Sequence, residues 1–158
     1  GPCQFCGAHT NRGVHECLEI FNVGFQVLDF SAVAHHRYRF LMVDAHALQH
    51  PEIHGRWSNH FHLTRLHLMH RYGVAWRYAL SPKLSDCLNA YKASRADEFL
   101  IAPELLKRGS VTSADVLQAS VDAAQCKDWI EKWALEVYEA WEANHAVADA
   151  VAQRFLGR

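Results

Sequence analysis

The sequence predicts an all-α protein: a single-domain bundle of five or six helices with a zinc-knuckle-like segment at its N-terminus. Apolar residues recur at intervals of three and four along most of the chain, as expected for amphipathic helices. No stretch alternates apolar and polar residues for long, and the Asn-Gly and Asp-Gly dipeptides of tight hairpins are absent. With 158 residues, the chain has the length of one domain and can bury a sizeable core.

The first three helices are predicted from periodicity and from stop signals. Residues 16–30 repeat apolar groups at helical spacing. Residues 38–50 are apolar nearly all round, which indicates a buried central helix, with a short buried strand as the alternative. This segment ends before Pro51, because proline disfavours helical backbone at the residue that precedes it. A third helix is predicted over 58–72 and ends at Gly73.

The second half of the chain is predicted to hold two short helices and one long one. A Ser-Pro pair supplies the cap and the first-turn proline of a helix over 81–91. Residues 93–111, with a proline and a glycine, are typical of a long loop. A threonine followed three residues later by an aspartate resembles a capping box and begins a helix over 113–121. Residues 122–156 are predicted to form one continuous helix.

That last helix carries an apolar stripe that steps by three or four residues. The stripe consists of Trp129, Trp133, Val137, Trp141, His145, Ala148, Ala152 and Phe155. Charged side chains occupy the remaining surface, so the stripe is expected to face the core. His145 lies within it and is therefore predicted to point inward.

The balance of charge excludes two classes of partner. Sixteen Lys and Arg residues against 17 Asp and Glu give a net charge of −1. A strong basic field for nucleic acid is therefore absent from the sequence, and we predict no nucleic-acid partner. No apolar run approaches the roughly 20 residues of a membrane helix, so we predict no membrane association either.

Gly1 and Pro2 are interpreted as the remnant of a cleaved purification tag. The single domain is then expected to span 3–156, with a Cys/His metal-binding segment over 3–17 and a helical bundle over 18–156. No signal peptide is visible, and three crowded cysteines favour metal binding over disulfides. These observations predict a cytoplasmic protein.

Three of the five cysteines lie in the first 17 residues, in a pattern typical of a zinc site. Cys3 and Cys6 form a Cys-x-x-Cys motif followed by glycine, and Cys17 comes eleven residues after Cys6. Zinc takes four ligands in a tetrahedron, so one more is needed. His15 or His9 can supply it, and His15 is favoured because it lies beside Cys17. Free cysteines in a flexible tail, or a redox pair, are the alternatives.

Nine of the 12 histidines lie between residues 35 and 70, and helical geometry selects those that point inward. His46 and His50 are four residues apart and share one face of the buried helix. His62 lies at the centre of the apolar face of the helix over 58–72. Asp44 also lies in the buried helix, where an unpaired carboxylate is costly, so it needs an arginine, a histidine or a metal. Together with His145, these residues predict a cluster in the bundle core.

Four other histidines in this part of the chain are predicted to lie on the surface: His54, His60, His67 and His70. His62 and His67 lie on the same predicted helix, but their side chains point in directions that differ by about 140°, so one is expected to face the core and the other the solvent. We expect His62→Ala to remove an inward-bound metal ion. We expect His67→Ala to change stability by no more than about 0.5 kcal/mol.

The inward cluster allows two interpretations. His46, His50, His62 and His145 can hold a second metal ion, and zinc, iron or copper suits imidazole ligands. Asp44, His50 and Arg56 are then the candidate catalytic residues, with Arg56 binding an anionic substrate. Alternatively, the histidines form a hydrogen-bonded structural network and Arg56 is a surface residue.

The sequence also resembles a family of small bacterial proteins of unknown function. The family pattern is a CxxCG start, a central VDAxAxQHP motif, a downstream His-Leu pair and a Trp-rich final helix ending near a histidine. The matching positions are Cys3, Cys6, Asp44, Gln49, His50, Pro51, His62, Trp133, Trp141 and His145. Family members often carry tyrosine at the position of His46. The resemblance implies no activity, but it emphasises Asp44, His50, His62 and His145.

Two functions follow as hypotheses. The first is a metal-dependent enzyme, a hydrolase, a transferase or a non-haem redox enzyme, which acts on a small molecule through the histidine cluster and has a structural zinc at the cysteines. The second is a non-enzymatic binding or interaction module, stabilised by zinc and by hydrogen-bonded histidines. A second metal outside the cysteine segment distinguishes them. In either case, we expect stability to fall between pH 7 and 5, as buried histidines become charged.

Overall fold

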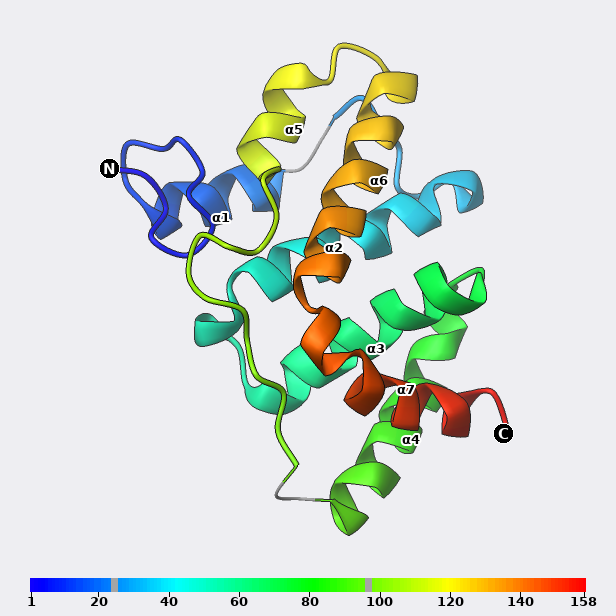
Figure 1. The fold of residues 1–158 in the computed structure, drawn as a ribbon. Coiled ribbons are helices and arrows are strands. Elements are labelled where there is room, and N and C mark those ends of the chain that lie inside the picture. The colour runs from blue at the N-terminus through cyan, green and yellow to red at the C-terminus, as the bar shows by residue number, and fades with distance from the viewer. Residues whose placement is uncertain (24–25, 96–97) are drawn as a thin grey trace.

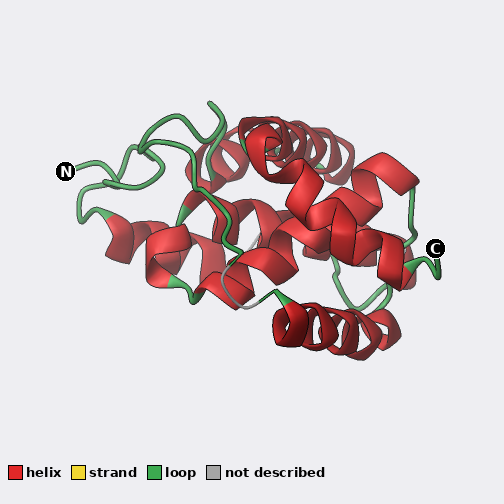
Figure 2. Cartoon of the chain, turned by 60° about the horizontal axis from the view of Figure 1, so that its bottom comes forward, coloured by secondary structure: helices red, strands yellow, loops and turns green. Residues whose placement is uncertain are grey.

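The computed structural model describes residues 1–23, 26–95 and 98–158, and this part of the chain consists of helices joined by turns and loops, with no strand (Figures 1 and 2). The all-α prediction is therefore confirmed. Seven α-helices form within the described residues: α1 Val14–Val23, α2 His36–Gln49, α3 Arg56–Tyr72, α4 Ser81–Ser94, α5 Ser113–Ala119, α6 Ala123–Ala140 and α7 His145–Phe155. Short 3₁₀ turns precede α2, α3, α4 and α7.

The centre of the bundle is α2, which packs against α6 on one side and α3 on another (Figure 1). Leu41, Met42 and Leu48 of α2 are completely buried, as the nearly continuous apolar composition predicts. The helix ends at Gln49, and the backbone of His50 leaves the helical region with φ −129° and ψ 45°. Pro51 then begins a 3₁₀ turn. This abrupt end fixes the position of the His50 side chain.

The first helix is shorter than predicted. It ends at Val23, and residues 26–30 form turns; residues 24 and 25 of the predicted helix lie outside the described part. The physical reason is that the two halves of the predicted segment pack in different places. Cys17 belongs to a small N-terminal cluster, whereas Leu28 and Phe30 pack onto the main core. The predicted loop over 93–111 includes residues 96 and 97, which also lie outside the described part.

The predicted continuous helix over 122–156 is also wrong, because the chain breaks between α6 and α7. Trp141 leaves the helix and donates its indole N–H to the Leu48 carbonyl oxygen, at 3.0 Å. Asn144 accepts from the Ile101 backbone N–H at 2.6 Å and donates to its carbonyl at 2.7 Å. These tertiary hydrogen bonds redirect the chain, so that α7 packs against α3 and α4. This break raises the helix count from six to seven.

Local signals set the end of α3 and the start of α5 as predicted. Gly73 ends α3 with a positive φ of 64°, a backbone conformation that glycine adopts without strain. Thr112 and Asp115 form a complete capping box at the start of α5. Both devices need only neighbouring residues, which is why the sequence reveals them.

Other ends differ: α3 begins at Arg56 rather than at residue 58, α5 ends at Ala119 rather than at 121, and α4 runs to Ser94 rather than to 91. Ser81 is the first residue of α4 and not its side-chain cap.

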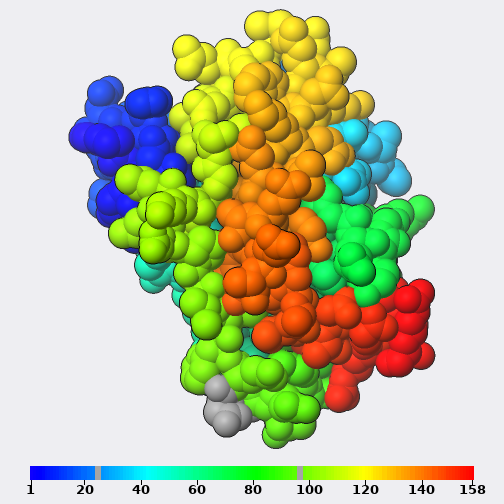
Figure 3. Space-filling view, in the orientation of Figure 1, coloured from blue at the N-terminus to red at the C-terminus, as the bar shows by residue number. Residues whose placement is uncertain are grey.

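The N-terminal segment has a small core of its own. Its buried residues are Cys3, Cys6, Ala8 and Cys17, separate from the main core. α1 packs against α5, and Figure 3 shows the segment as a lobe beside the chain that leads to α5. Three of these four core residues are cysteines, so the lobe buries little hydrocarbon. No helix in the described part of the chain is long and apolar enough to cross a membrane.

Candidate functional site

One group of metal-ligating side chains stands out where the N-terminal lobe meets the bundle. Cys3, Cys6, Cys17 and His50 are all buried, and one ligand atom from each lies within 4.8 Å of the other three. Cys3 and Cys6 come from the N-terminal loop, Cys17 from α1, and His50 from the end of α2. Within the described residues, it is the only such group of three or more.

A tight turn brings Cys3 and Cys6 together. The Gly7 N–H donates to the Cys3 carbonyl at 2.8 Å, and the Cys3 N–H donates to the Ala8 carbonyl at 3.0 Å. Gly7 has a φ of 78°, which glycine tolerates. A Cβ atom there would also lie 3.3 Å from Leu106. The glycine of the Cys-x-x-Cys-Gly motif is therefore favoured by its backbone conformation, whereas the exposed Leu106 side chain could shift to admit a Cβ atom.

Three of the six distances between ligand atoms are close to the edges of a zinc tetrahedron, and the other three are within 4.8 Å. Bonds of about 2.3 Å to sulfur and 2.0–2.1 Å to nitrogen place two sulfurs about 3.8 Å apart and a sulfur and a nitrogen about 3.5 Å apart. The Sγ atoms of Cys6 and Cys17 are 3.7 Å apart. The Nε2 atom of His50 lies 3.5 Å from Cys3 Sγ and 3.4 Å from Cys17 Sγ. All three cysteines are free of disulfides.

The orientation of His50 suits a metal ligand. Its Nδ1 atom lies 2.6 Å from the carbonyl oxygen of His46 and must donate to it, since a carbonyl only accepts. In the neutral imidazole, Nε2 then carries a lone pair, and it faces the sulfurs. Metal-bound histidines are commonly held by a hydrogen bond of this kind from the other ring nitrogen.

The two closest cysteines favour different protonation states. The hydrogen bond with Cys6 lowers the pKa of the Cys17 thiol, and His46 and His50 lower it further, against the effect of burial. The same hydrogen bond, together with burial, raises the pKa of Cys6. Cys17 is therefore disposed to be a thiolate, the form that binds metal.

His46 lies beside the group rather than in it. Its Nε2 atom is 3.7 Å from Cys17 Sγ, and its ring stacks on His50 with centroids 4.1 Å apart. Phe21 covers the other face of the ring at 4.2 Å. His46 is placed to hold His50 and to hydrogen-bond with Cys17.

His15 and His9, the expected suppliers of the fourth ligand, are both exposed and outside the group. This corrects the sequence-based choice of His15. The sequence favours His15 because it lies close to Cys17 along the chain. The helical turn that follows Gly13, however, directs Cys17 toward α2 and leaves His15 on the surface. The fourth position is filled by a residue 33 positions after Cys17.

The structure does not bring His62 or His145 to His50, so the expected core metal site does not form. His62 Nδ1 lies 2.7 Å from a carboxylate oxygen of Asp44. Arg65 donates to both oxygens of that carboxylate, at 2.6 Å from Nη2 and 2.9 Å from Nε. Asp44 is fully buried, and this pairing supplies the partner that its burial requires. The alternative interpretation, a hydrogen-bonded network, describes His62 and Asp44.

The predicted surface positions of His60 and His67 are wrong, since their exposed fractions are 1% and 2%. The helical wheel assumed that one face of α3 is buried. In the bundle, α3 packs against α2, α4, α6 and α7, so most of its circumference is covered. His67 consequently bonds to Tyr138 and Asp149, and its replacement is no longer expected to be neutral.

Arg56, proposed as a catalytic residue, lies at the first position of α3, outside the Cys/His group. Its guanidinium carbon lies 4.1 Å from the ring centroid of Phe99 and 5.0 Å from that of Trp57. These cation–π contacts fasten the segment after α4 to the start of α3.

Gln49 is a positioning residue whose role the sequence does not reveal. Its amide donates to the carbonyl oxygens of Arg108 and Val111, at 3.1 and 2.8 Å. Its side-chain oxygen accepts from the Trp133 indole at 3.0 Å. The Gln-His-Pro run thus holds the loop before α5, supplies His50 and ends α2. In the sequence, only the position of Gln49 at the end of a nearly all-apolar helix, just before His50 and Pro51, could have indicated this positioning role.

Stability should fall as the pH drops below about 6.5. Burial lowers the pKa of His60, His67 and His70 in the folded protein. The unfolded chain, with ordinary histidines near 6.5, then binds more protons below that pH, so acid favours unfolding. Melting temperatures from pH 8 to 5.5 test this, and His60→Leu should show a shallower decline than the unmodified protein. Parallel curves for the two proteins would contradict a contribution from His60.

Comparison with known proteins places the chain in a family. The model of a family of unknown function, DUF5946, matches residues 1–142, so this chain belongs to that family. The match agrees with the resemblance seen in the sequence. No curated protein and no solved structure matches the chain.

Proposed function

We propose that this protein is a zinc-binding helical module in which one zinc ion joins the N-terminal lobe to the bundle. The observation that carries the proposal is the buried Cys3, Cys6, Cys17 and His50 group, whose ligand atoms lie within 4.8 Å of one another and include three pairs close to the edge lengths of a zinc tetrahedron. Thiolate and imidazole donors in a tetrahedron select zinc among the common divalent ions. The reduced thiols are also consistent with a cytoplasmic location.

The proposed role of the ion is structural. Four protein ligands complete a tetrahedron and leave no position for substrate or water, as in structural zinc sites. The ion would also compensate for the poor hydrophobic core of the lobe, where cysteines occupy most of the buried positions. Binding to a site that forms only on folding stabilises the folded state. The zinc-stabilised module is thus favoured over a metal-dependent enzyme.

Metal analysis tests the proposal. Protein purified without a nickel column and reconstituted with zinc should contain about one zinc per chain, and Cys6→Ser should contain almost none. Cys87→Ser is the matched control, because Cys87 lies on α4, away from the group, and should retain the ion. Unmodified protein that holds no zinc after reconstitution, or Cys6→Ser protein that holds a full equivalent, would show the proposal to be wrong.

A further inference from the structure

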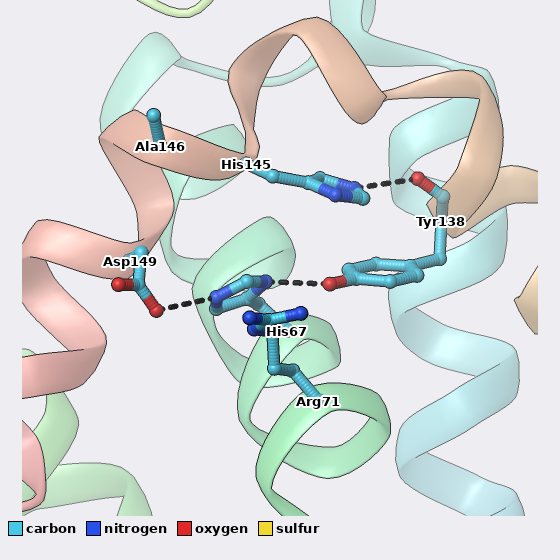
Figure 4. A pocket seen from close by; sticks show the side chains of 6 residues that line it. All are labelled: His67, Arg71, Tyr138, His145, Ala146 and Asp149. Carbon is cyan, nitrogen blue, oxygen red and sulfur yellow. Dashed lines mark hydrogen bonds and ion pairs between the residues drawn. The ribbon is translucent and has the colours of Figure 1, made fainter.

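A second cluster of polar side chains lines a cavity between α3, α6 and α7. The cavity has a volume of about 240 Å³. Its lining residues are His67, Arg71, Tyr138, His145, Ala146 and Asp149 (Figure 4). His67 and Arg71 are four residues apart on α3, as are His145 and Asp149 on α7, so each pair projects from one helix face.

Hydrogen bonds fix the orientation of the inner wall. Asp149 Oδ1 lies 2.7 Å from His67 Nε2 and accepts from the Tyr72 hydroxyl at 2.6 Å. Gln153 donates to Asp149 Oδ2 at 3.2 Å. A carboxylate that receives these donors is an acceptor, so His67 Nε2 carries a proton. His67 Nδ1 then accepts from the Tyr138 hydroxyl, 2.6 Å away.

The opposite wall is flat and aromatic. The ring of His145 stacks on that of Tyr138 with centroids 4.0 Å apart and an angle of 16° between the planes. His145 Nε2 lies 2.8 Å from the Tyr138 carbonyl oxygen and donates to it. No hydrogen bond among the described residues involves His145 Nδ1, which carries a lone pair because Nε2 donates, so this nitrogen is available to a hydrogen-bond donor of a ligand.

The two charged groups at the cavity are stabilised differently. Neutral donors from His67, Tyr72 and Gln153 stabilise the Asp149 carboxylate by hydrogen bonds but do not neutralise its charge. The guanidinium of Arg71, by contrast, pairs with no carboxylate of the described chain within ion-pair distance, and its side chain is exposed. Its side chain hydrogen-bonds with Tyr72, and its charge acts on His67 and Tyr138. Burial is the main cause of the lowered pKa of His67 and of the raised pKa of Tyr138. Figure 4 shows the guanidinium in front of His67.

We propose that this cavity binds a small oxyanion, a carboxylate or a phosphate group, through Arg71. Guanidinium groups bind such anions with two parallel hydrogen bonds. Because His145 Nε2 donates to a carbonyl, Nδ1 is an acceptor, and it accepts a hydrogen bond from a protonated oxygen of the ligand, such as the P–OH of hydrogen phosphate. The hydrogen-bonded chain of Asp149, His67 and Tyr138 keeps the inner wall in place. The cavity lies apart from the Cys/His group, so this binding is independent of the proposed zinc. Its volume suits a ligand smaller than the usual occupants of pockets of about 300–1,000 Å³.

Nuclear magnetic resonance of the zinc-loaded protein tests the proposal. Inorganic phosphate and acetate, titrated separately at constant ionic strength, should distinguish the two anions by which of them saturates. The ring protons of His67 and His145 should shift together, with a single dissociation constant. Arg71→Gln should weaken that binding about tenfold or more. Arg154→Gln on α7 is the control, since Arg154 is exposed and does not line the cavity, and should bind as the unmodified protein does.

Two outcomes would overturn the proposal. In the first, neither anion shifts the His67 and His145 signals saturably. In the second, Arg71→Gln and Arg154→Gln bind equally well, which would indicate a general charge effect. Because Arg71 is exposed, its replacement should leave the fold intact, and an unchanged melting temperature confirms this.

Discussion

His50→Ala should lose the bound zinc and lower the melting temperature markedly. The change removes one of four ligands, so zinc affinity should fall by more than the roughly 10- to 100-fold that loss of an outer-shell partner typically causes. Removal also leaves Cys3 and Cys17 without the imidazole that lies 3.5 and 3.4 Å from their sulfurs. Zinc titration with a competing chelator measures the affinity, and thermal unfolding with and without zinc measures the linked stability.

His15→Ala is the matched control. His15 is the histidine nearest to Cys17 along the chain, yet it is exposed and outside the group. Its replacement should leave zinc content unchanged and stability within about 0.5 kcal/mol of the unmodified protein. If His15→Ala loses zinc while His50→Ala keeps it, the assignment of the fourth ligand is wrong.

Asp44→Ala should cost about 3–5 kcal/mol of the free energy of unfolding, the range expected when a buried ion pair loses one partner. Asp44 is fully buried, and Arg65 is only 5% exposed. Arg65 also lies over the rings of Phe40 and Phe61, at 4.9 and 5.2 Å from their centroids, so it cannot readily turn to solvent. The substitution therefore strands a positive charge in the core. Urea unfolding of the zinc-loaded protein measures the loss.

Glu131→Ala provides the comparison for that loss. Glu131 also binds an arginine with two hydrogen bonds, from Arg37 at 2.7 and 3.1 Å. The side chains of Glu131 and Arg37 are each 37% exposed, and ion pairs near the surface contribute only about 0–1 kcal/mol. Similar losses for Asp44→Ala and Glu131→Ala would contradict the role of burial.

The helices and the cysteine donors were determined largely by the sequence itself. The buried character of α2, its stop at the Gln-His-Pro run, the glycine that ends α3 and the capping box of α5 depend on residues a few positions apart. The same holds for the turn that joins Cys3 and Cys6. Such short-range preferences act through backbone sterics and local hydrogen bonds, so they are visible without tertiary information.

The tertiary structure decided which histidine joins the cysteines and which histidines are buried. His50 rather than His15 reaches the cysteines, because α1 packs beside α5 at the end of α2. His67 is buried because α7 turns back onto α3, and that turn depends on hydrogen bonds from residues as distant as Leu48 and Ile101. A helical wheel gives the direction of a side chain from its own axis, but what lies in that direction depends on the packing of other helices. For that reason the sequence alone determined the donor types and most helix ends, while the partners of the donors were set by the fold.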